Sequence, residues 1–393
     1  MKCLQNYQKA LKLLICLLLA LSLTGCGSAV ELNKRVFVKM IILDKTKKGI
    51  ELTLNSPLPN RLIPGRVAGG QLGKPYNFVK REGKDISDAF RKIQSDLSRE
   101  ISLGQTDVVI IGRELAEEGI DPVLEFLERN SSFHINSNLF VTAGKATEIL
   151  HFPVIYERFP SDIIKAYANE HATVATTIKD FLMAKYSVGS VMAPLLKFGN
   201  TTEEFEKKRW MRNDGAAIFK RGKLTTTTNT KEMKGGLLIL NQWENKEIGI
   251  PSPTDGKIVN FSIRKVHTKI KPIVKGDEIV VHIQSKADAS VLASNSNINL
   301  ENTKHLKLLE KKLDAEVEKL INQSIERTRE AKADAFGFGN YISWKYPHKW
   351  NDLKQNWEDI YSNDIKITVQ VNSSVKSLGA ERGTLIKRKG SVK

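Results

Sequence analysis

The amino terminus constrains this chain most, because it carries an apolar run of eleven residues from Leu13 to Leu23 in which Ser22 is the one polar member. Three lysines and no acidic residue precede the run. As a helix the run spans about 16 Å, roughly half of the ~30 Å hydrocarbon core of a bilayer. The pattern therefore predicts an export signal and not a membrane-spanning helix, with the folded part of the chain after it.

The next residues, Leu23-Thr24-Gly25-Cys26, resemble the bacterial lipobox, at which signal peptidase II cleaves before a cysteine that carries a diacylglyceryl group. The thiol is needed because the lipid is attached through sulfur, and small residues before it fit the protease. We predict that residues 1–25 are a lipoprotein signal peptide and that Cys26 is the lipidated first residue of the mature chain. The alternative is an ordinary secretory signal with a chance cysteine near its cleavage site.

Cysteine usage supports this prediction, because Cys3 and Cys16 both lie in the segment to be removed. The mature chain, 393 − 25 = 368 residues, then has no thiol besides Cys26. This excludes disulfides, cysteine metal sites and cysteine nucleophiles from the folded part.

The chain is basic, with 61 Lys+Arg against 44 Asp+Glu and a net charge of +17. A charge of this size attracts polyanions. We expect no nucleic-acid partner, since the chain is exported and shows no RNP-like aromatic pattern and no recognition-helix signature. The anionic membrane surface or the cell wall is the predicted partner of the excess charge, and a merely solvated basic surface is the alternative.

Hydrophobic periodicity predicts mixed α and β structure without repeats. In the first half, the expected elements are a β-hairpin over 36–54, a helix over 85–101, a buried strand over 107–112, helices over 114–118 and 121–129, a strand over 138–142, a short helix ending near 150, and two helices around 163–167 and 178–182. A Pro/Gly/Asn stretch and the charged segment 201–212 follow, and we place a domain boundary there, near Lys208.

The second half is predicted to be β-rich from Gly215 to about Ala293. Its expected elements are strands over 216–219, 258–266 and 278–283, a long amphipathic helix over 301–331 and a closing strand over 365–371.

Catalytic motifs are absent from the sequence: there is no His-Glu-x-x-His, no Gly-x-Ser-x-Gly and no Walker-type loop. Gly337-Phe338-Gly339 lacks a preceding strand and a third glycine, so it does not predict a dinucleotide site. The seven histidines are scattered without ligand spacing. A glycosidase needs two acids, and nothing in the sequence selects a pair. We expect no cofactor and no metal.

The segment from Asp334 to Tyr361 is the most distinctive. Ala331, Ala335 and Gly339 recur every four residues, which predicts a narrow helical stripe open to close backbone approach. Pro347 is expected to open a new helix. Its apolar face would carry Trp350, Leu353, Trp357, Ile360 and Tyr361. We interpret this face as a core helix, with a ligand pocket as the alternative.

Together these residues resemble a known family. The string Asp334-Ala335-Phe336-Gly337-Phe338-Gly339, followed by Tyr346-Pro347, Trp350, Trp357, Val369 and Val371, is similar to the C-terminal signature of the Ger(x)C spore germination lipoproteins. Upstream stretches that also resemble the family are 31–33, 109–116, 119–120, 143–146 and 149–150. One departure is Gly27-Ser28, where the family usually has Trp-Asp after the lipid cysteine, and another is Tyr361, where the family often has Phe.

The resemblance implies an α+β, multidomain fold of three mixed α/β domains, each around a largely antiparallel sheet. With our boundaries the expected division is signal peptide 1–25, N-terminal germination-protein domain 26–207, β-rich middle domain 208–297, and C-terminal domain 298–393 with the long helix and closing strand. The implied structural signature residues are Asp334, Gly337, Phe338, Gly339, Pro347, Trp350 and Trp357.

For function, the resemblance implies a non-enzymatic C subunit of a spore nutrient germinant receptor. Diacylglyceryl and N-acyl lipid on Cys26 would hold it at the outer face of the spore inner membrane, beside integral-membrane A and B subunits. Two other classes are kept as alternatives: a solute-binding lipoprotein of a transporter, and an extracytoplasmic enzyme that acts on the cell wall.

Overall fold

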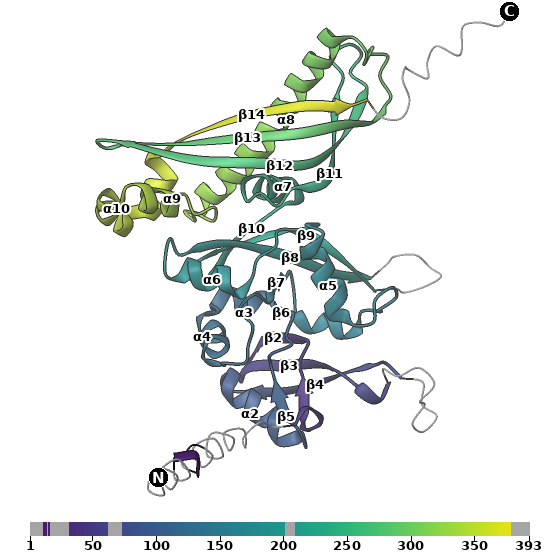
Figure 1. Cartoon of the computed structure of the whole chain (residues 1–393), viewed down its shortest axis with the longest axis vertical. Helices are drawn as coiled ribbons and strands as arrows, with labels where there is room; N and C mark the ends of the chain where they lie inside the picture. Colours follow the sequence, from purple (N-terminus) through teal and green to yellow (C-terminus); the bar gives the residue numbers. More distant parts are fainter. Residues whose placement is uncertain (1–10, 14, 16–30, 62–72, 201–208, 379–393) are drawn as a thin grey trace, which may run out of the picture.

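Two large β-sheets, each covered by helices, form the computed structural model, which describes residues 11–13, 15, 31–61, 73–200 and 209–378 (Figure 1). Cys26, Gly27-Ser28 and nearly all of the predicted signal peptide lie outside the described residues. The expected α+β, multidomain class is confirmed, and antiparallel strand pairs outnumber parallel ones in both large sheets.

The first sheet has eight strands in the order β10-β9-β8-β7-β6-β2-β3-β4. Their bounds are β2 (Met40–Thr46), β3 (Gly49–Pro57), β4 (Tyr76–Gly83), β6 (Val108–Ile111), β7 (Asn138–Thr142), β8 (Ser190–Asn200), β9 (Arg209–Lys220) and β10 (Lys223–Thr228). The central strands β2, β6, β7 and β8 run parallel, and antiparallel strands flank them on both sides. A short parallel pair, β1 (Arg35–Phe37) and β5 (Glu100–Ser102), forms a separate two-stranded sheet.

Both faces of the eight-stranded sheet are buried, as the alternation along β2 shows. Ile41 and Leu43 belong to a core with α2 (Ile86–Asp96), α3 (Arg113–Glu118), α4 (Asp121–Arg129) and α6 (Ile178–Lys185). Met40 and Ile42 belong to a second core with η3 (Ala146–His151) and α5 (Pro160–Asn169). Strands covered on both faces lose the polar–apolar alternation, which explains the continuous apolar run at 108–111.

The second sheet has four strands in the order β11-β12-β13-β14. Its strands are β11 (Glu244–Pro251), β12 (Ile258–Lys275), β13 (Glu278–Ser294) and β14 (Lys366–Ser377). The helices of this half are α7 (Thr230–Ile239), α8 (Thr303–Glu330), α9 (Phe338–Lys345), α10 (Pro347–Leu353) and α11 (Trp357–Asp359), with the single turns η4 (Lys354–Asn356) and η5 (Ile360–Asp364). Two further short turns, η1 (Leu32–Lys34) and η2 (Pro59–Arg61), belong to the first half.

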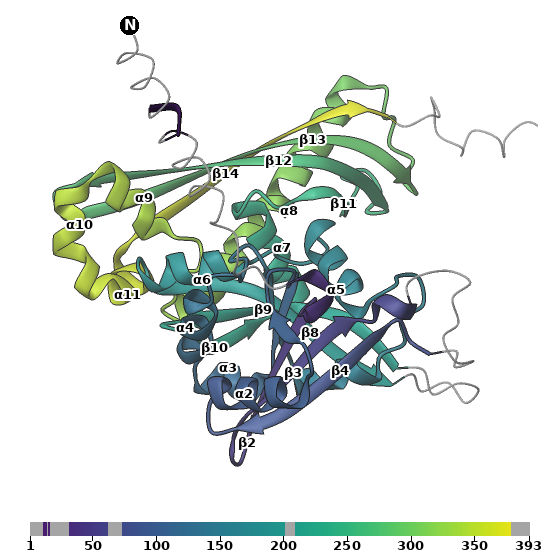
Figure 2. The ribbon, with the colours of Figure 1, turned by 60° about the horizontal axis from the view of Figure 1, so that its bottom comes forward.

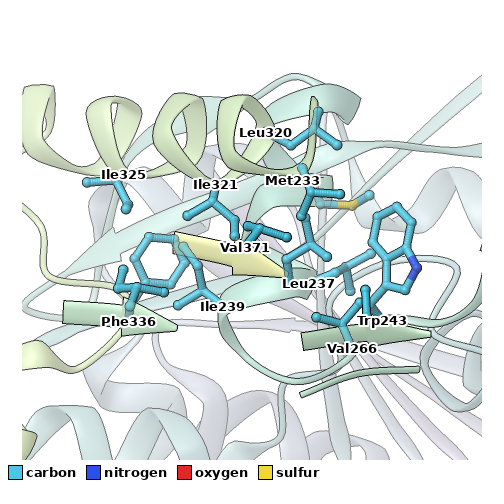
Figure 3. Packing of buried hydrophobic residues seen from close by; sticks show 14 of the residues in the cluster. Met233, Leu237, Ile239, Trp243, Val266, Leu320, Ile321, Ile325, Phe336 and Val371 are labelled. Atoms are coloured by element: carbon cyan, nitrogen blue, oxygen red, sulfur yellow. The ribbon is translucent and has the colours of Figure 1, made fainter. Parts of the chain in front are cut away.

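Helix α7 lies between the two sheets in both views (Figures 1 and 2). One apolar cluster contains Met192 and Ile218 of the first sheet, together with residues of α7, the second sheet and α8. Figure 3 shows Leu237 of α7, Val266 of the second sheet and Ile321 of α8 within this cluster. The helices α7 and α8 approach closely, because a Cβ on Gly235 would lie 2.0 Å from the Leu320 carbonyl oxygen. The two sheets therefore share one core through α7.

The predicted boundary between 207 and 208 lies between β8 and β9, which are antiparallel neighbours in one sheet. The predicted middle segment 208–297 contributes β9 and β10 to the first sheet and β11 to β13 to the second. Helix α8 and β14, from the predicted last segment, complete the second sheet. The division of the chain into domains stays a prediction.

Several local predictions need correction. The helix predicted over 85–101 ends at Asp96, and residues 100–102 form β5. Strand β8 was not predicted because Pro194 and Gly199 interrupt its apolar run. Helix α7 was not predicted either, since Gly235-Gly236 lowers helix propensity. The contact with α8 explains why a glycine stands at 235.

Helix α8 covers the free edge of β14 with a row of carboxylates. Glu310, Asp314 and Glu318, four residues apart, accept hydrogen bonds from the backbone N–H groups of Val375, Ser373 and Val371, at 2.9, 2.6 and 3.1 Å. Four helical residues rise about 6.0 Å and two strand residues about 6.6 Å, so the two repeats match. The unpaired N–H groups of this edge strand are thereby satisfied.

This row predicts a pH dependence of stability. Burial raises the pKa of Asp314, the Ser373 hydrogen bonds oppose the rise, and the carboxylates of Glu318 and Glu310 add to it. The native state therefore holds the proton of Asp314 more tightly than the unfolded chain does, and protonated Asp314 stabilises the fold. This stabilisation is lost as pH rises from about 4 through the raised pKa of Asp314, so the free energy of unfolding falls over that range.

In Asp314→Asn the amide oxygen can still accept from Ser373, but the side chain no longer titrates. The variant should therefore gain stability relative to the unsubstituted chain as pH is raised, in urea unfolding measured from about pH 4 to about pH 7. A difference that stays constant with pH, or that favours the unsubstituted chain as pH rises, would contradict this.

Candidate functional site

The signature residues gather around one buried carboxylate, Asp334, in the loop that joins α8 to α9. Its side chain is 2% exposed. It accepts hydrogen bonds from the backbone N–H groups of Phe338 (2.9 Å) and Gly339 (2.8 Å) and from Trp357 Nε1 (2.9 Å). The carboxylate thus satisfies the first N–H groups of α9 and joins that helix to α11.

Asp334 has no cation against it among the described residues. Burial raises the pKa of Asp334, and the three N–H donors act in the opposite sense because they favour the ionised form. A carboxylate held in this way faces the protein on every side. It is built as a structural centre and has no open surface toward a substrate.

The two glycines of the signature are explained by backbone conformation and space. Gly337 has φ +69°, in the left-handed region, directly before α9. A Cβ on Gly339 would lie 2.6 Å from Trp350, 2.7 Å from Val188 and 2.8 Å from Trp357 Nε1. The side chains of the following helices therefore pack against the bare backbone of α9.

The aromatic residues of the 334–361 segment form one connected group next to this loop. The ring centroids of Trp350 and Trp357 are 5.2 Å apart, those of Trp357 and Tyr361 6.3 Å, and those of Phe338 and Tyr361 6.1 Å. The Tyr361 hydroxyl lies 2.6 Å from Thr328 Oγ1 on α8, and burial raises the pKa of Tyr361 well above its ordinary range. This hydroxyl is the difference from the Phe that the family often carries, and Thr328 satisfies it.

Pro347 begins α10, as expected, but the helix does not continue unbroken to Tyr361. A 3₁₀ turn, a short α-helical turn and a π-helical turn follow one another over 354–364. Trp357 and Tyr361 are buried, and Trp350, Leu353 and Ile360 pack half-buried against the same cluster. The interpretation as core packing accounts for these side chains.

The helical stripe predicted at Ala331, Ala335 and Gly339 is wrong. Helix α8 ends at Glu330, and Lys332 then takes a left-handed φ of +50°. Residues 331–337 form the loop that carries Asp334, so the four-residue spacing has no helical meaning here. At Gly339 the close contacts are with the side chains of Trp350, Val188 and Trp357, whereas the stripe predicted the close approach of another backbone.

A second buried carboxylate brings together two of the upstream stretches that resemble the family. Asp44, at the end of the apolar part of β2, is 4% exposed. It accepts hydrogen bonds from the backbone N–H groups of Ala146 and Thr147, both at 2.8 Å. Gly112 lies against it, because a Cβ there would be 1.9 Å from Asp44 Oδ1. Residues 109–116 and 143–146 therefore meet at this carboxylate.

Sequence reasoning did not single out Asp44. The available signal was an acidic residue within the otherwise apolar run Met40-Ile41-Ile42-Leu43-Asp44 of a strand covered on both faces. Such a residue needs donors at the end of its strand.

A third carboxylate, Asp107, is paired with two lysines. It forms ion pairs with Lys165 at 2.6 Å and with Lys39. Burial opposes ionisation of this group, but the two ammonium groups outweigh burial and hold the pKa of Asp107 below its ordinary value. The ion pair of Asp107 and Lys165 is partly open to solvent beside His134 and Ser137.

Within the described ranges, no three His, Cys, Asp or Glu side chains are grouped so that they could hold a metal ion. Among the helices of those same ranges, none is both long enough and apolar enough to cross a bilayer.

The Asp334 centre gives a stability prediction. In Asp334→Asn one carboxylate oxygen becomes an NH₂ group, which cannot accept from the converging donors. At least one buried N–H then loses its partner, and we expect the free energy of unfolding to fall by about 1–3 kcal/mol in urea titrations.

The matched control is Asp352→Asn on the exposed side of α10, which should leave unfolding unchanged within error. Equal stability of the Asp334 variant and the unsubstituted chain would show that the three hydrogen bonds do not hold the loop.

Comparison with known proteins places these features in a family. Residues 28–198 match the family model described as spore germination protein N-terminal domain, and residues 214–379 match the model described as spore germination B3/GerAC like, C-terminal. The two matches lie in chain order and together include both Asp44 and Asp334.

Individual relatives match over nearly their whole length. YfkR of Bacillus subtilis (strain 168) is 27% identical over 92% of this chain and 94% of its own. Spore germination protein KC of the same organism is also 27% identical, over 95% of this chain and 96% of its own. The crystal structure of the GerBC protein shares the fold, with a TM-score of 0.53 and 21% identity over 86% of this chain and 96% of that one. The chain belongs to the Ger(x)C family of spore germination proteins.

Proposed function

We propose that this protein is the lipid-anchored, non-enzymatic C subunit of a spore nutrient germinant receptor, and that it acts with the membrane subunits A and B at the outer face of the spore inner membrane. One observation carries the proposal: the match to the germination N-terminal domain begins at residue 28, two residues after the cysteine of Leu-Thr-Gly-Cys. The lipid on Cys26 would therefore join directly onto the family domain.

The physical consequence of such an anchor is confinement. Each buried methylene of an acyl chain contributes about 0.8 kcal/mol, and two or more chains give stable attachment. A protein confined in this way meets its membrane partners at a high effective concentration, so modest interfaces are sufficient for assembly.

The buried carboxylates support a role without catalysis. Asp334 and Asp44 are the most enclosed acidic groups of the described chain, and both are engaged by backbone N–H groups. A general acid or base must reach its substrate, and these two groups face protein. Asp334 and Asp44 thus serve to position loops and helices.

The anchor is tested by Cys26→Ala. Without the thiol no diacylglyceryl group can be attached, and the expected result is loss of the nutrient-induced germination response, with the unfolded fraction of the protein unchanged. Membrane fractionation and mass spectrometry of the amino terminus give the localisation and the modification.

Cys16→Ala is the matched control, since it removes a thiol inside the predicted signal and should leave lipidation and response intact. A full nutrient response from a soluble, unlipidated chain would contradict the tethering. Failure to recover A and B subunits with the lipidated protein after mild solubilisation would contradict the partnership.

A further inference from the structure

The outward face of the second sheet carries a group of exposed lysines. The buried residues of β12 and β13 alternate with exposed ones, and their inward side packs against the cluster that includes α7 and α8. Helix α8 crosses behind the strands in Figure 1, which leaves the opposite side of the sheet toward solvent. We define the lysine face as the exposed residues Lys269, Lys271, Lys275, Lys286 and Lys366.

Strand register brings these side chains together. Lys269 lies opposite Gln284, Lys271 opposite His282, and Lys286 opposite His267. The parallel partner β14 adds Lys366, opposite Val280. Positions that are distant in sequence, on three strands, therefore form one basic surface.

This charge is not neutralised within the described chain. None of the five lysines has an ion-pair partner among the described residues. On β12 to β14 the outward acidic residues are Asp288, which pairs with Lys376 at 3.6 Å, and Glu278, which lies opposite Lys275 at the turn, so the other four lysines have no carboxylate opposite them in the register. The carboxylates of Glu244 and Glu247 lie on the separate edge strand β11.

The lysine face surrounds a small apolar site. Ile273 and Val280 lie directly opposite each other near the β12–β13 turn and are half-buried. They do not belong to the cluster under the sheet, although the neighbouring Val274 does. Lys271, Lys275 and Lys366 therefore surround an outward-facing apolar pair.

We propose that the lysine face docks on the anionic headgroup layer of a lipid bilayer, with the Ile273–Val280 pair at the level of the acyl boundary. Lysine stems lie along apolar surface while their ammonium groups reach the headgroups. Lysine is depleted in protein–protein interfaces, where arginine is enriched, so the composition favours a lipid surface over an acidic protein partner. The inference rests on the proposed function in one respect, since the lipid on Cys26 is what would bring the face to the membrane.

The test uses a chain that carries no lipid, so that the face alone is measured. All members of the three cores lie after residue 37, and a chain from residue 26 with Cys26→Ser retains them all. Its partition is measured by co-sedimentation with vesicles of equal parts phosphatidylglycerol and phosphatidylcholine, and with vesicles of phosphatidylcholine alone.

We expect binding to the anionic vesicles only, and weaker binding as salt is raised. Each lysine near an anionic surface strengthens partitioning roughly fivefold, so Lys269→Gln, Lys271→Gln and Lys286→Gln together should weaken it on the order of 100-fold. The matched control removes the same charge from the exposed side of α8, on the other side of the sheet, as Lys304→Gln, Lys307→Gln and Lys311→Gln, and should change binding little.

Equal loss in both triple variants would mean that net charge alone acts, and would overturn the proposal. Equal binding to neutral and anionic vesicles would also overturn it. Unchanged vesicle binding of the lysine-face variant would overturn it too, and is the result expected if the lysine face meets an acidic protein instead. Circular dichroism melts check that both triple variants fold. If either variant does not fold, the salt dependence of vesicle binding by the unsubstituted chain still tests the proposal. A failure of lipidation at Cys26 would leave all these results untouched, so the two proposals fail separately.

Discussion

The packing of α7 between the two sheets is the contact on which the rest of the structure depends. Its apolar side chains meet β8 and β9 in one direction and β12 and α8 in the other, within a single cluster. Gly235 allows this approach, because any side chain there would meet the backbone of α8. Close-packed interiors transmit displacement without much deformation, so the sheets are expected to move as one body.

Buried carboxylates fasten the loops onto this body. Asp44 holds the turn after β7 to the end of β2, and Asp334 holds the start of α9 to Trp357. Both use N–H groups that would otherwise lack partners, which is why an acidic residue is stable in these enclosed positions. The coupling of membrane partners that we propose would rely on this rigidity, and the proposed lipid and lysine face would give the protein two separate contacts with the membrane.

Much of the fold could be predicted from the sequence where burial is periodic. The hairpin of β2 and β3, the buried strand β6 and the amphipathic α8 follow directly from their apolar spacing. The same reasoning failed at α7 and β8, where Gly235-Gly236 and Pro194 suggest a break and long-range contacts decide otherwise. Resemblance to the family identified Asp334 and its neighbours, but their convergence on one carboxylate, and the role of Asp44, depend on contacts between distant segments. Spacing alone also misplaced the alanine stripe, because a left-handed Lys332 ends the helix.

The shared core is tested most directly by hydrogen exchange pulsed along a urea titration of the folded chain. Peptides from β2 and β6 report on the first sheet, peptides from β12 and β13 on the second, and α7 lies between them. One common midpoint for all three groups is the result predicted by a cluster that the two sheets share. Two separate midpoints, with α7 exchanging before either sheet, would contradict it.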